Sequence, residues 1–201
     1  MKIIGLTGGI SSGKNFIAEI FAKKGALVFD ADAQVHSLME SDKSMIDEVV
    51  KNFPDSFSHG KIDRKILSKI VFSDKKKLKI LEEIIHPRVR KAYENFLTSA
   101  KTKADLIILN IPLLLESEAY ECDYVIAIIP SKKVQLLRFL AREKIKHPQM
   151  SDAELTAKFE RVIASQLSNE ERLKHADFVV KNEGSAEETT AEIEEILRAI
   201  S

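Results

Sequence analysis

Residues 3–15, IIGLTGGISSGKN, join an apolar run directly to a glycine-rich turn that ends in lysine. Gly8, Gly13 and Lys14 match the G-x-x-x-x-G-K pattern, in which backbone N–H groups surround the phosphates of a nucleotide. Apolar residues after Lys14 recur at helical spacing, so we expect a helix whose N-terminus attracts an anion. Residues 8–14, the glycine-rich loop, are therefore predicted to bind phosphate between a strand and a helix.

The residue after the lysine departs from that pattern. Ser or Thr, whose hydroxyl holds Mg²⁺, is usual there, but this chain has Asn15. An amide oxygen can ligate Mg²⁺, but its longer side chain displaces the ligand, and Mg²⁺ requires near-ideal octahedral geometry. Asn15→Ser is accordingly expected to lower the Mg²⁺ requirement. The alternative, a turn with a coincidental lysine, is disfavoured because strand and helix patterns flank the loop.

Composition excludes several classes of protein. The 201 residues suffice for one α/β domain with a small inserted subdomain. Charge is balanced at 31 basic and 31 acidic residues, which predicts no nucleic-acid or membrane-binding surface. The single cysteine, Cys122, rules out an internal disulfide, and no apolar run reaches the roughly 18 residues of a membrane span. We expect a soluble, cytoplasmic protein.

Two aspartates follow the second predicted strand, residues 26–29. Asp30 and Asp32 would lie at its carboxyl end, where open parallel sheets bind ligands. A carboxylate there can deprotonate or orient an attacking hydroxyl, or hold the water shell of a metal. Alternatively, either aspartate caps a helix that begins near Ala33. The pattern favours a functional role for Asp32 and leaves Asp30 open.

The segment 33–99 shows no convincing strand pattern and is predicted to form a helical acceptor-binding subdomain. A turn is expected at His59-Gly60-Lys61, and the residue before Pro87 should leave the helical region, placing His86 at a helix break. His86 could be a ligand or a structural residue. Helices are predicted over 33–39, 43–53, 64–72 and 75–85, with a fresh helix from Pro87 through Phe96.

Three further apolar runs complete the sheet. They cover residues 106–109, 124–129 and 177–181, and a terminal amphipathic helix covers 186–200. Five strands with helical crossovers predict a parallel α/β sheet with helices on both faces. Asn110 follows the third strand, where many P-loop proteins carry a magnesium-binding aspartate.

A helix from Ser131 carries two arginines four residues apart. Arg138 and Arg142 share a helical face and could close over a phosphoryl group, or could simply favour a helix C-terminus. A capped helix beginning at Asp152 makes residues 138–158 a candidate lid.

The chain contains, in order, the segments Gly8-Gly-Ile-x-Ser-Gly-Lys14, Asp30-Ala-Asp32, Ile85-His-Pro87, Pro112-Leu-Leu-x-Glu116, Gln135-x-x-Arg138-x-x-x-Arg142, Arg161-x-x-x-x-Gln166 and Ala176-Asp-x-x-x-x-Asn182. Taken together, these segments closely resemble the dephospho-CoA kinase family over nearly the whole chain. Asn15 and Asn110 depart from the family pattern.

The resemblance implies transfer of the ATP γ-phosphoryl group to the ribose 3′-hydroxyl of dephospho-CoA, the last step of coenzyme A synthesis. It also implies a P-loop kinase sheet of strand order 2-3-1-4-5, with Mg²⁺ required. The implied catalytic residues are Asp32 as base, with Lys14 and Arg142. The implied ATP-binding residues are Gly8, Gly9, Ile10, Ser11, Ser12, Gly13, Lys14, Asn15, Arg138, Arg142 and Asn182. The implied acceptor-binding residues are Thr7, Asp32, His86, Pro112, Leu113, Glu116 and Arg161, and the metal residues are Asn15 and Asp32.

Two alternatives remain open. A nucleoside or nucleoside-monophosphate kinase would use the helical segment for a smaller acceptor. A non-catalytic nucleotide-binding switch is supported by Asn15 alone. In each case we expect a single domain, present as a monomer or weak homo-oligomer.

Overall fold

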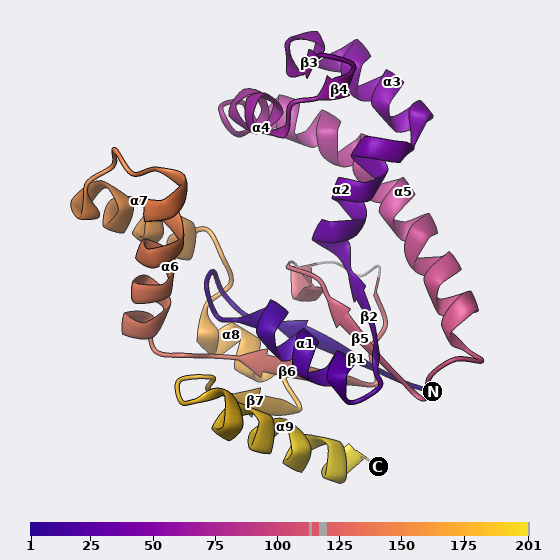
Figure 1. Ribbon diagram of the computed structural model, residues 1–201, viewed down its shortest axis with the longest axis vertical. Helices are drawn as coiled ribbons and strands as arrows, with labels where there is room; N and C mark the ends of the chain where they lie inside the picture. Colours follow the sequence, from indigo (N-terminus) through magenta and orange to yellow (C-terminus); the bar gives the residue numbers. More distant parts are fainter. Residues whose placement is uncertain (113, 117–119, 201) are drawn as a thin grey trace. The chain divides into compact units, whose positions relative to one another are not determined.

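The computed structural model describes residues 1–112, 114–116 and 120–200 of the chain (Figure 1). The chain divides into two compact units. The sheet unit comprises Met1–Val28 and Lys103–Ser201, and the helical unit comprises Phe29–Thr102.

A five-stranded sheet forms the centre of the α/β fold. Its strands are β1 (Lys2–Thr7), β2 (Leu27–Asp30), β5 (Leu106–Asn110), β6 (Tyr124–Ile128) and β7 (Phe178–Val180). Their order is β2-β5-β1-β6-β7, and β1 pairs in parallel with both β5 and β6, as β6 does with β7. Counted along the chain, this is 2-3-1-4-5. The predicted class and order are confirmed, and the strand ends agree with the sequence to within one residue.

Two helices of the sheet unit share a buried core with the strands. They are α1 (Lys14–Lys23) and α9 (Ala186–Ile200), which contribute Ile17, Phe21, Ile193 and Ile200 to one cluster with the strand side chains. In both helices the apolar residues recur every three or four positions, so that one face can be buried. The predicted terminal helix over 186–200 is confirmed.

The segment after β6 forms a helix pair. It contains α6 (Lys132–Lys146) and α7 (Asp152–Ala164), followed by the short α8 (Asn169–Lys174). On the other side of β6, the preceding element of the chain is the short helix η2 (Leu114–Glu116). Phe139 of α6 packs against Leu155 and Phe159 of α7. Ser151 begins α7 with a capping box, because its hydroxyl accepts from the Glu154 N–H while the Glu154 carboxylate accepts from the Ser151 N–H.

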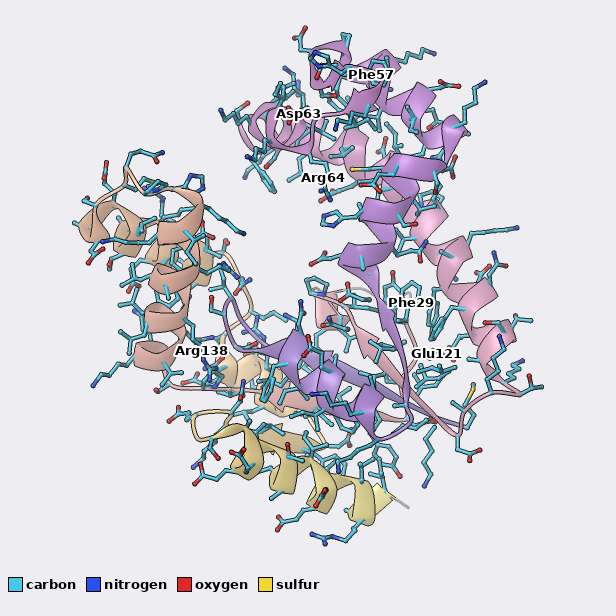
Figure 2. All side chains as sticks on the ribbon, viewed as in Figure 1. Phe29, Phe57, Asp63, Arg64, Glu121 and Arg138 are labelled. Carbon is cyan, nitrogen blue, oxygen red and sulfur yellow. The ribbon has the colours of Figure 1, made fainter. Side chains whose placement is uncertain are left out.

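The helical unit has its own core. Its elements are α2 (Ala31–Ser41), α3 (Lys43–Asn52), η1 (Pro54–Ser56), β3 (Phe57–Ser58), β4 (Lys61–Ile62), α4 (Arg64–Phe72) and α5 (Lys75–Ala100). Met45, Val49, Leu67, Val71 and Leu81 meet in a single buried cluster. Figure 2 labels Phe57 at the start of β3 and Asp63, the N-cap of α4, beside Arg64.

Two expectations for the helical unit are wrong. Segment 33–99 does contain strands, since β3 and β4 form a short antiparallel hairpin around the predicted turn. His59 and Gly60 at that turn have φ values of 51° and 76°, the left-handed conformation that two-residue hairpins require. The second error is the helix break at His86, because α5 continues through Pro87.

Burial explains why α5 does not break. Leu81 and Ile84 before Pro87, and Val89 and Tyr93 after it, are all buried, so apolar packing on both sides holds the helix together. Interior proline typically costs a helix about 3 kcal/mol, which several buried side chains can offset. His86 is therefore an exposed residue within a helix.

Among the residues that the structure describes, no helix is both long enough and apolar enough to cross a membrane.

Candidate active site

The glycine-rich loop leaves β1 at Thr7 and enters α1 at Lys14. Gly13, the N-cap of α1, has φ 95°, and a β-carbon there would collide with the side-chain nitrogen of Asn182. A β-carbon on Gly8 would lie 2.8 Å from the carbonyl oxygen of Ile128. Gly8 is therefore required by the close approach of the Ile128 backbone, and Gly13 by its positive φ and by the adjacent Asn182 side chain.

This loop carries three polar side chains, those of Ser11, Ser12 and Lys14. The Lys14 ammonium donates to the carbonyl oxygen of Gly8 at 3.1 Å, so the cation folds back over the loop. The Ser11 and Ser12 hydroxyl oxygens are shielded from solvent and have no hydrogen-bond partner among the described residues. A loop with a cation, two hydroxyls and the N-terminus of α1 can bind an anion.

Two glutamine side chains bind the backbone carbonyl and the backbone N–H of Ile10 in this loop. Gln135 of α6 donates from Nε2 to the Ile10 carbonyl at 3.1 Å, and the Ile10 N–H donates to Oε1 of Gln166 at 2.9 Å. The Ile10 side chain packs on the cluster formed by α6 and α7. Ile10 therefore links the loop to the helix pair through both its backbone groups and its side chain.

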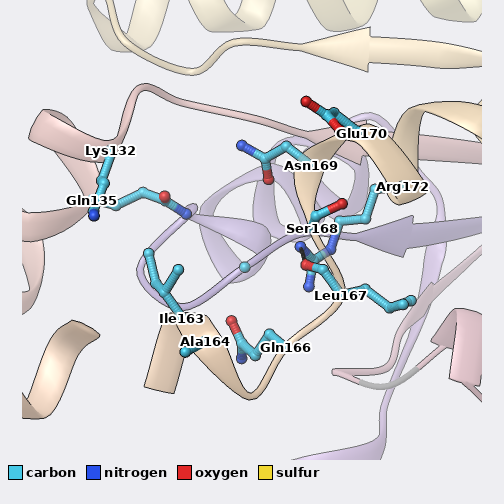
Figure 3. Close-up of a pocket in the computed structure, with 11 residues that line it drawn as sticks. Lys132, Gln135, Ile163, Ala164, Gln166, Leu167, Ser168, Asn169, Glu170 and Arg172 are labelled. Carbon is cyan, nitrogen blue, oxygen red and sulfur yellow. Dashed lines mark hydrogen bonds between the residues drawn. The ribbon is translucent and has the colours of Figure 1, made fainter. Parts of the chain in front are cut away.

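A cavity of about 450 Å³ lies beside this contact. It is lined by Gly9, Gln135, Gln166 and Arg172, with the end of α7 and the start of α8 (Figure 3). A β-carbon on Gly9 would lie 3.1 Å from Nε2 of Gln135 and 3.4 Å from Oε1 of Gln166, so a larger residue would press on both amides. Glycine at this position keeps the loop in contact with its supports.

Exchanging each glutamine for glutamate tests these two contacts. Gln166→Glu keeps an oxygen that accepts from the Ile10 N–H, whereas Gln135→Glu places a carboxylate against a carbonyl at a position only 3% exposed. We expect Gln135→Glu to lower the free energy of unfolding by about 1–3 kcal/mol, and Gln166→Glu by less than about 1 kcal/mol. Urea unfolding measures both. Equal losses would contradict the assigned donor and acceptor.

Arg138 and Asn182 support the loop from its other side. Arg138 donates to the carbonyl oxygens of Asn182 at 2.8 Å and Ser12 at 3.4 Å, and its place on α6 is labelled in Figure 2. The Asn182 side chain is buried and donates to the same Ser12 carbonyl at 2.8 Å. Asn182 itself has φ 49°, a conformation that asparagine tolerates better than most residues. These contacts orient the last peptide groups before Lys14.

Arg142 lies one turn further along α6 and is exposed. Its guanidinium is 3.3 Å from the Glu143 carboxylate and 5.6 Å from the Phe139 ring centroid. Lys158 of α7 approaches the same carboxylate at 2.6 Å. Burial alone would raise the pKa of Glu143, but the hydrogen bond and charge of Lys158, with the charge of Arg142, hold it below its usual value. Glu143 is thus an anion that holds the side chains of Arg142 on α6 and Lys158 on α7.

Asn15 and Asn110 meet at the base of the loop. Nδ2 of Asn110, the last residue of β5, donates to Oδ1 of Asn15 at 2.9 Å. Asn110 is 4% exposed, whereas Asn15 is exposed in the first turn of α1.

The two aspartates lie at the junction of β2 and α2. Asp30 is the N-cap of α2, and its carboxylate accepts from the Ala33 N–H at 2.8 Å. Asp32 lies in the first turn of that helix and is exposed. The capping role that the sequence left open therefore belongs to Asp30.

The remaining predicted residues are spread over several elements. Thr7 is buried at the end of β1, Pro112 lies in a turn, Glu116 ends η2 and Arg161 is exposed on α7. Leu113 lies outside the described residues.

Gln135, Gln166 and Arg172 were not among the predicted site residues. Gln135 and Arg172 are 3% and 4% exposed, and polar side chains so deeply buried need partners. Two signals were available: Gln135 and Gln166 stand in segments that match the family, and Gln135 also lies among the apolar positions of α6.

Comparisons with known proteins identify the family. A family model described as dephospho-CoA kinase matches residues 2–188. A dephospho-CoA kinase of Fusobacterium nucleatum is 41% identical over 203 residues, covering 100% of this chain and 99% of the relative. The structure of TT1252 from Thermus thermophilus matches with a TM-score of 0.81 at 30% identity, covering 100% of this chain and 98% of that one. Dephospho-CoA kinase from Campylobacter jejuni matches with a TM-score of 0.67 at 28% identity, covering 99% and 96% of the two chains. The chain belongs to the dephospho-CoA kinase family.

Proposed function

We propose that this protein transfers the γ-phosphoryl group of ATP to the ribose 3′-hydroxyl of dephospho-CoA, giving CoA and ADP. The observation that carries the proposal is the glycine-rich loop between β1 and α1, with Lys14 folded onto Gly8, in a chain of this family. In the reaction a bond forms between the ribose 3′-oxygen and the γ-phosphorus. The bond between the γ-phosphorus and the oxygen that bridges it to the β-phosphorus breaks, and that oxygen leaves on ADP. The proton of the ribose hydroxyl passes to a base.

The glycine-rich loop would bind the β- and γ-phosphates. Backbone N–H groups at the start of α1 and the Ser11 and Ser12 hydroxyls are suitable donors. Lys14 is close enough to exchange its contact with the Gly8 carbonyl for a phosphate oxygen, where its charge neutralises the transferring group.

The residues at the base of the loop fit a magnesium ion that arrives with the nucleotide. Oδ1 of Asn15 is a hard oxygen ligand, and its bond to Asn110 uses one of its two lone pairs. Asn15 would hold the ion, with Asp32 a further candidate. Magnesium would supply charge neutralisation on the β- and γ-phosphate oxygens.

Asp32 is the proposed base. It follows β2, which the sheet order separates from β1 by β5 alone. Asp32 is an exposed residue in the first turn of α2, and the Asp30 carboxylate caps that helix. The helical unit, with His86 on α5, would bind the acceptor, as would Thr7, Pro112, Leu113, Glu116 and Arg161.

Arg142 and the α6–α7 pair would form the lid, residues 138–158 being its proposed core. Arg142 is held by Glu143 but exposed, so its guanidinium can contact a phosphate. Arg138 and Asn182 would act on ATP through the loop peptides that they support. We further propose a cytoplasmic protein, monomeric or weakly self-associating.

An acceptor-dependent ADP assay tests the function. Protein, ATP and Mg²⁺ are mixed with dephospho-CoA, AMP or adenosine, and ADP release is followed together with formation of CoA. We expect turnover with dephospho-CoA alone. Faster turnover with AMP or adenosine would indicate a nucleotide or nucleoside kinase, and ATP binding without any turnover would indicate a switch.

A further inference from the structure

Asn15 and Asn110 occupy two linked positions at the carboxyl edge of the sheet. Asn15 directly follows the loop lysine, and Asn110 ends β5, where it pairs with Leu6 of β1. Phosphate-loop enzymes generally hold Mg²⁺ with a Ser or Thr at the first position and an aspartate from a neighbouring strand. Here both positions carry amides, and the amides bind one another.

The direction of this hydrogen bond distinguishes the pair from a hydroxyl and a carboxylate. A carboxylate only accepts, so the loop hydroxyl would donate to the strand residue. In this chain the strand residue donates, from Nδ2 of Asn110 to Oδ1 of Asn15 at 2.9 Å. Asn110 therefore cannot be exchanged alone for aspartate without losing this donor. A serine at position 15 could still accept, but its shorter side chain would end further from Asn110.

We propose that Asn15 and Asn110 work as one neutral metal-binding unit, in which Asn110 orients the Asn15 oxygen toward the cation. The inference rests on the proposed nucleotide function, because the unit carries no charge and the cation must be held chiefly by the nucleotide phosphates. Divalent metal should consequently bind this position tightly only when nucleotide is present.

The proposal predicts that the single substitutions weaken metal binding and that the double substitution does not. Asn15→Ser shortens the side chain by about one bond, so its oxygen withdraws from Asn110. Asn110→Asp sets a carboxylate against the Asn15 oxygen, and the amide must turn its NH₂ group toward the carboxylate, which removes its oxygen from the cation. In the double variant the serine hydroxyl donates to the aspartate and keeps a lone pair for the metal. The pairing found here thus reverses the expectation that Asn15→Ser alone improves metal binding.

Binding of Mn²⁺, measured by electron paramagnetic resonance with and without ADP, tests the unit independently of turnover. We expect each single variant to weaken Mn²⁺ binding to the protein–ADP complex, and the double variant to bind at least as tightly as the parent. The Mn²⁺ affinity of the double variant should exceed, by about tenfold or more, the affinity expected from multiplying the two single effects. Directly coupled residues deviate from independence in this way. Asn52→Ser, an exposed substitution in α3, is the matched control and should change nothing.

Two results would overturn the inference. Single effects that simply multiply would show that the two asparagines act independently. Equally tight Mn²⁺ binding without ADP would show a metal site that needs no nucleotide. Failure of the parent protein to bind ADP at all, with or without Mn²⁺, would instead refute the proposed function and the inference that rests on it.

The buried carboxylate of the Asn110→Asp variant could prevent folding, so a second measurement uses only the parent protein and the Asn15→Ser variant. The side-chain NH₂ resonances of Asn110 in a ¹⁵N spectrum should shift when Asn15→Ser removes their acceptor. They should also shift when Mg²⁺ is added to the parent ADP complex, but not when it is added to the Asn15→Ser complex. Identical responses to Mg²⁺ in both proteins would refute the unit.

Discussion

Lys14→Ala should nearly abolish phosphoryl transfer while leaving the protein folded. The ammonium lies 3.1 Å from the Gly8 carbonyl, and no other residue of the loop is a cation. Removing a charged donor from a phosphoryl-transfer site costs about 10²- to 10³-fold or more in kcat. The lost hydrogen bond to Gly8 should lower the free energy of unfolding by only about 1 kcal/mol. Steady-state turnover and thermal melting separate the two effects.

Lys23→Ala is the matched control for that experiment. Lys23 lies on the same helix but is exposed in its last turn, so its loss should leave turnover unchanged. Lys14→Met adds a second comparison, because it keeps most of the aliphatic side chain and removes only the charge. A folded Lys14→Ala protein with turnover near that of the parent would refute the phosphate-binding role of the loop.

Asp32→Asn should lower kcat by about 10²- to 10⁴-fold, the usual contribution of a general base. Asparagine keeps the size and hydrogen bonding of aspartate but cannot accept the hydroxyl proton. The KM for dephospho-CoA should change little, because the lost interaction belongs to the transition state. Initial rates over a range of dephospho-CoA concentrations, at saturating ATP and Mg²⁺, measure both constants.

Asp30 provides the comparison two residues away. Its carboxylate caps α2 through the Ala33 N–H, and asparagine caps helices about as well as aspartate, so Asp30→Asn should cost little activity or stability. The assignment of the base is wrong if Asp32→Asn stays within a few-fold of the parent. It is equally wrong if Asp30→Asn proves the more damaging change.

Local patterns were sufficient for the individual strands and for the loop motif. The strands β1, β5 and β6 are short apolar runs covered on both faces, and such runs are readable without tertiary information. The glycine-rich loop was equally visible, because the left-handed φ of Gly13 and the nearby Asn182 side chain restrict this position to glycine. The strand order needed the resemblance to a known family, since spacing along the chain does not specify which strands are neighbours.

Tertiary packing decided the features that depend on distant partners. Pro87 predicts a break by local rules, but buried residues on both sides keep α5 continuous. Gln135 and Gln166 reach Ile10 across more than one hundred residues of sequence, so neither contact leaves a periodic signal.

Asn15 and Asn110, the proposed metal-binding pair, show the same division between sequence and tertiary structure. The sequence by itself determined that asparagine stands at both position 15 and position 110, and hence that neither position carries a charge. Only the tertiary structure decided that these two amides bind each other and which of them donates. The physical reason is that a hydrogen bond depends on distance and direction between side chains 95 residues apart, which the fold alone brings together.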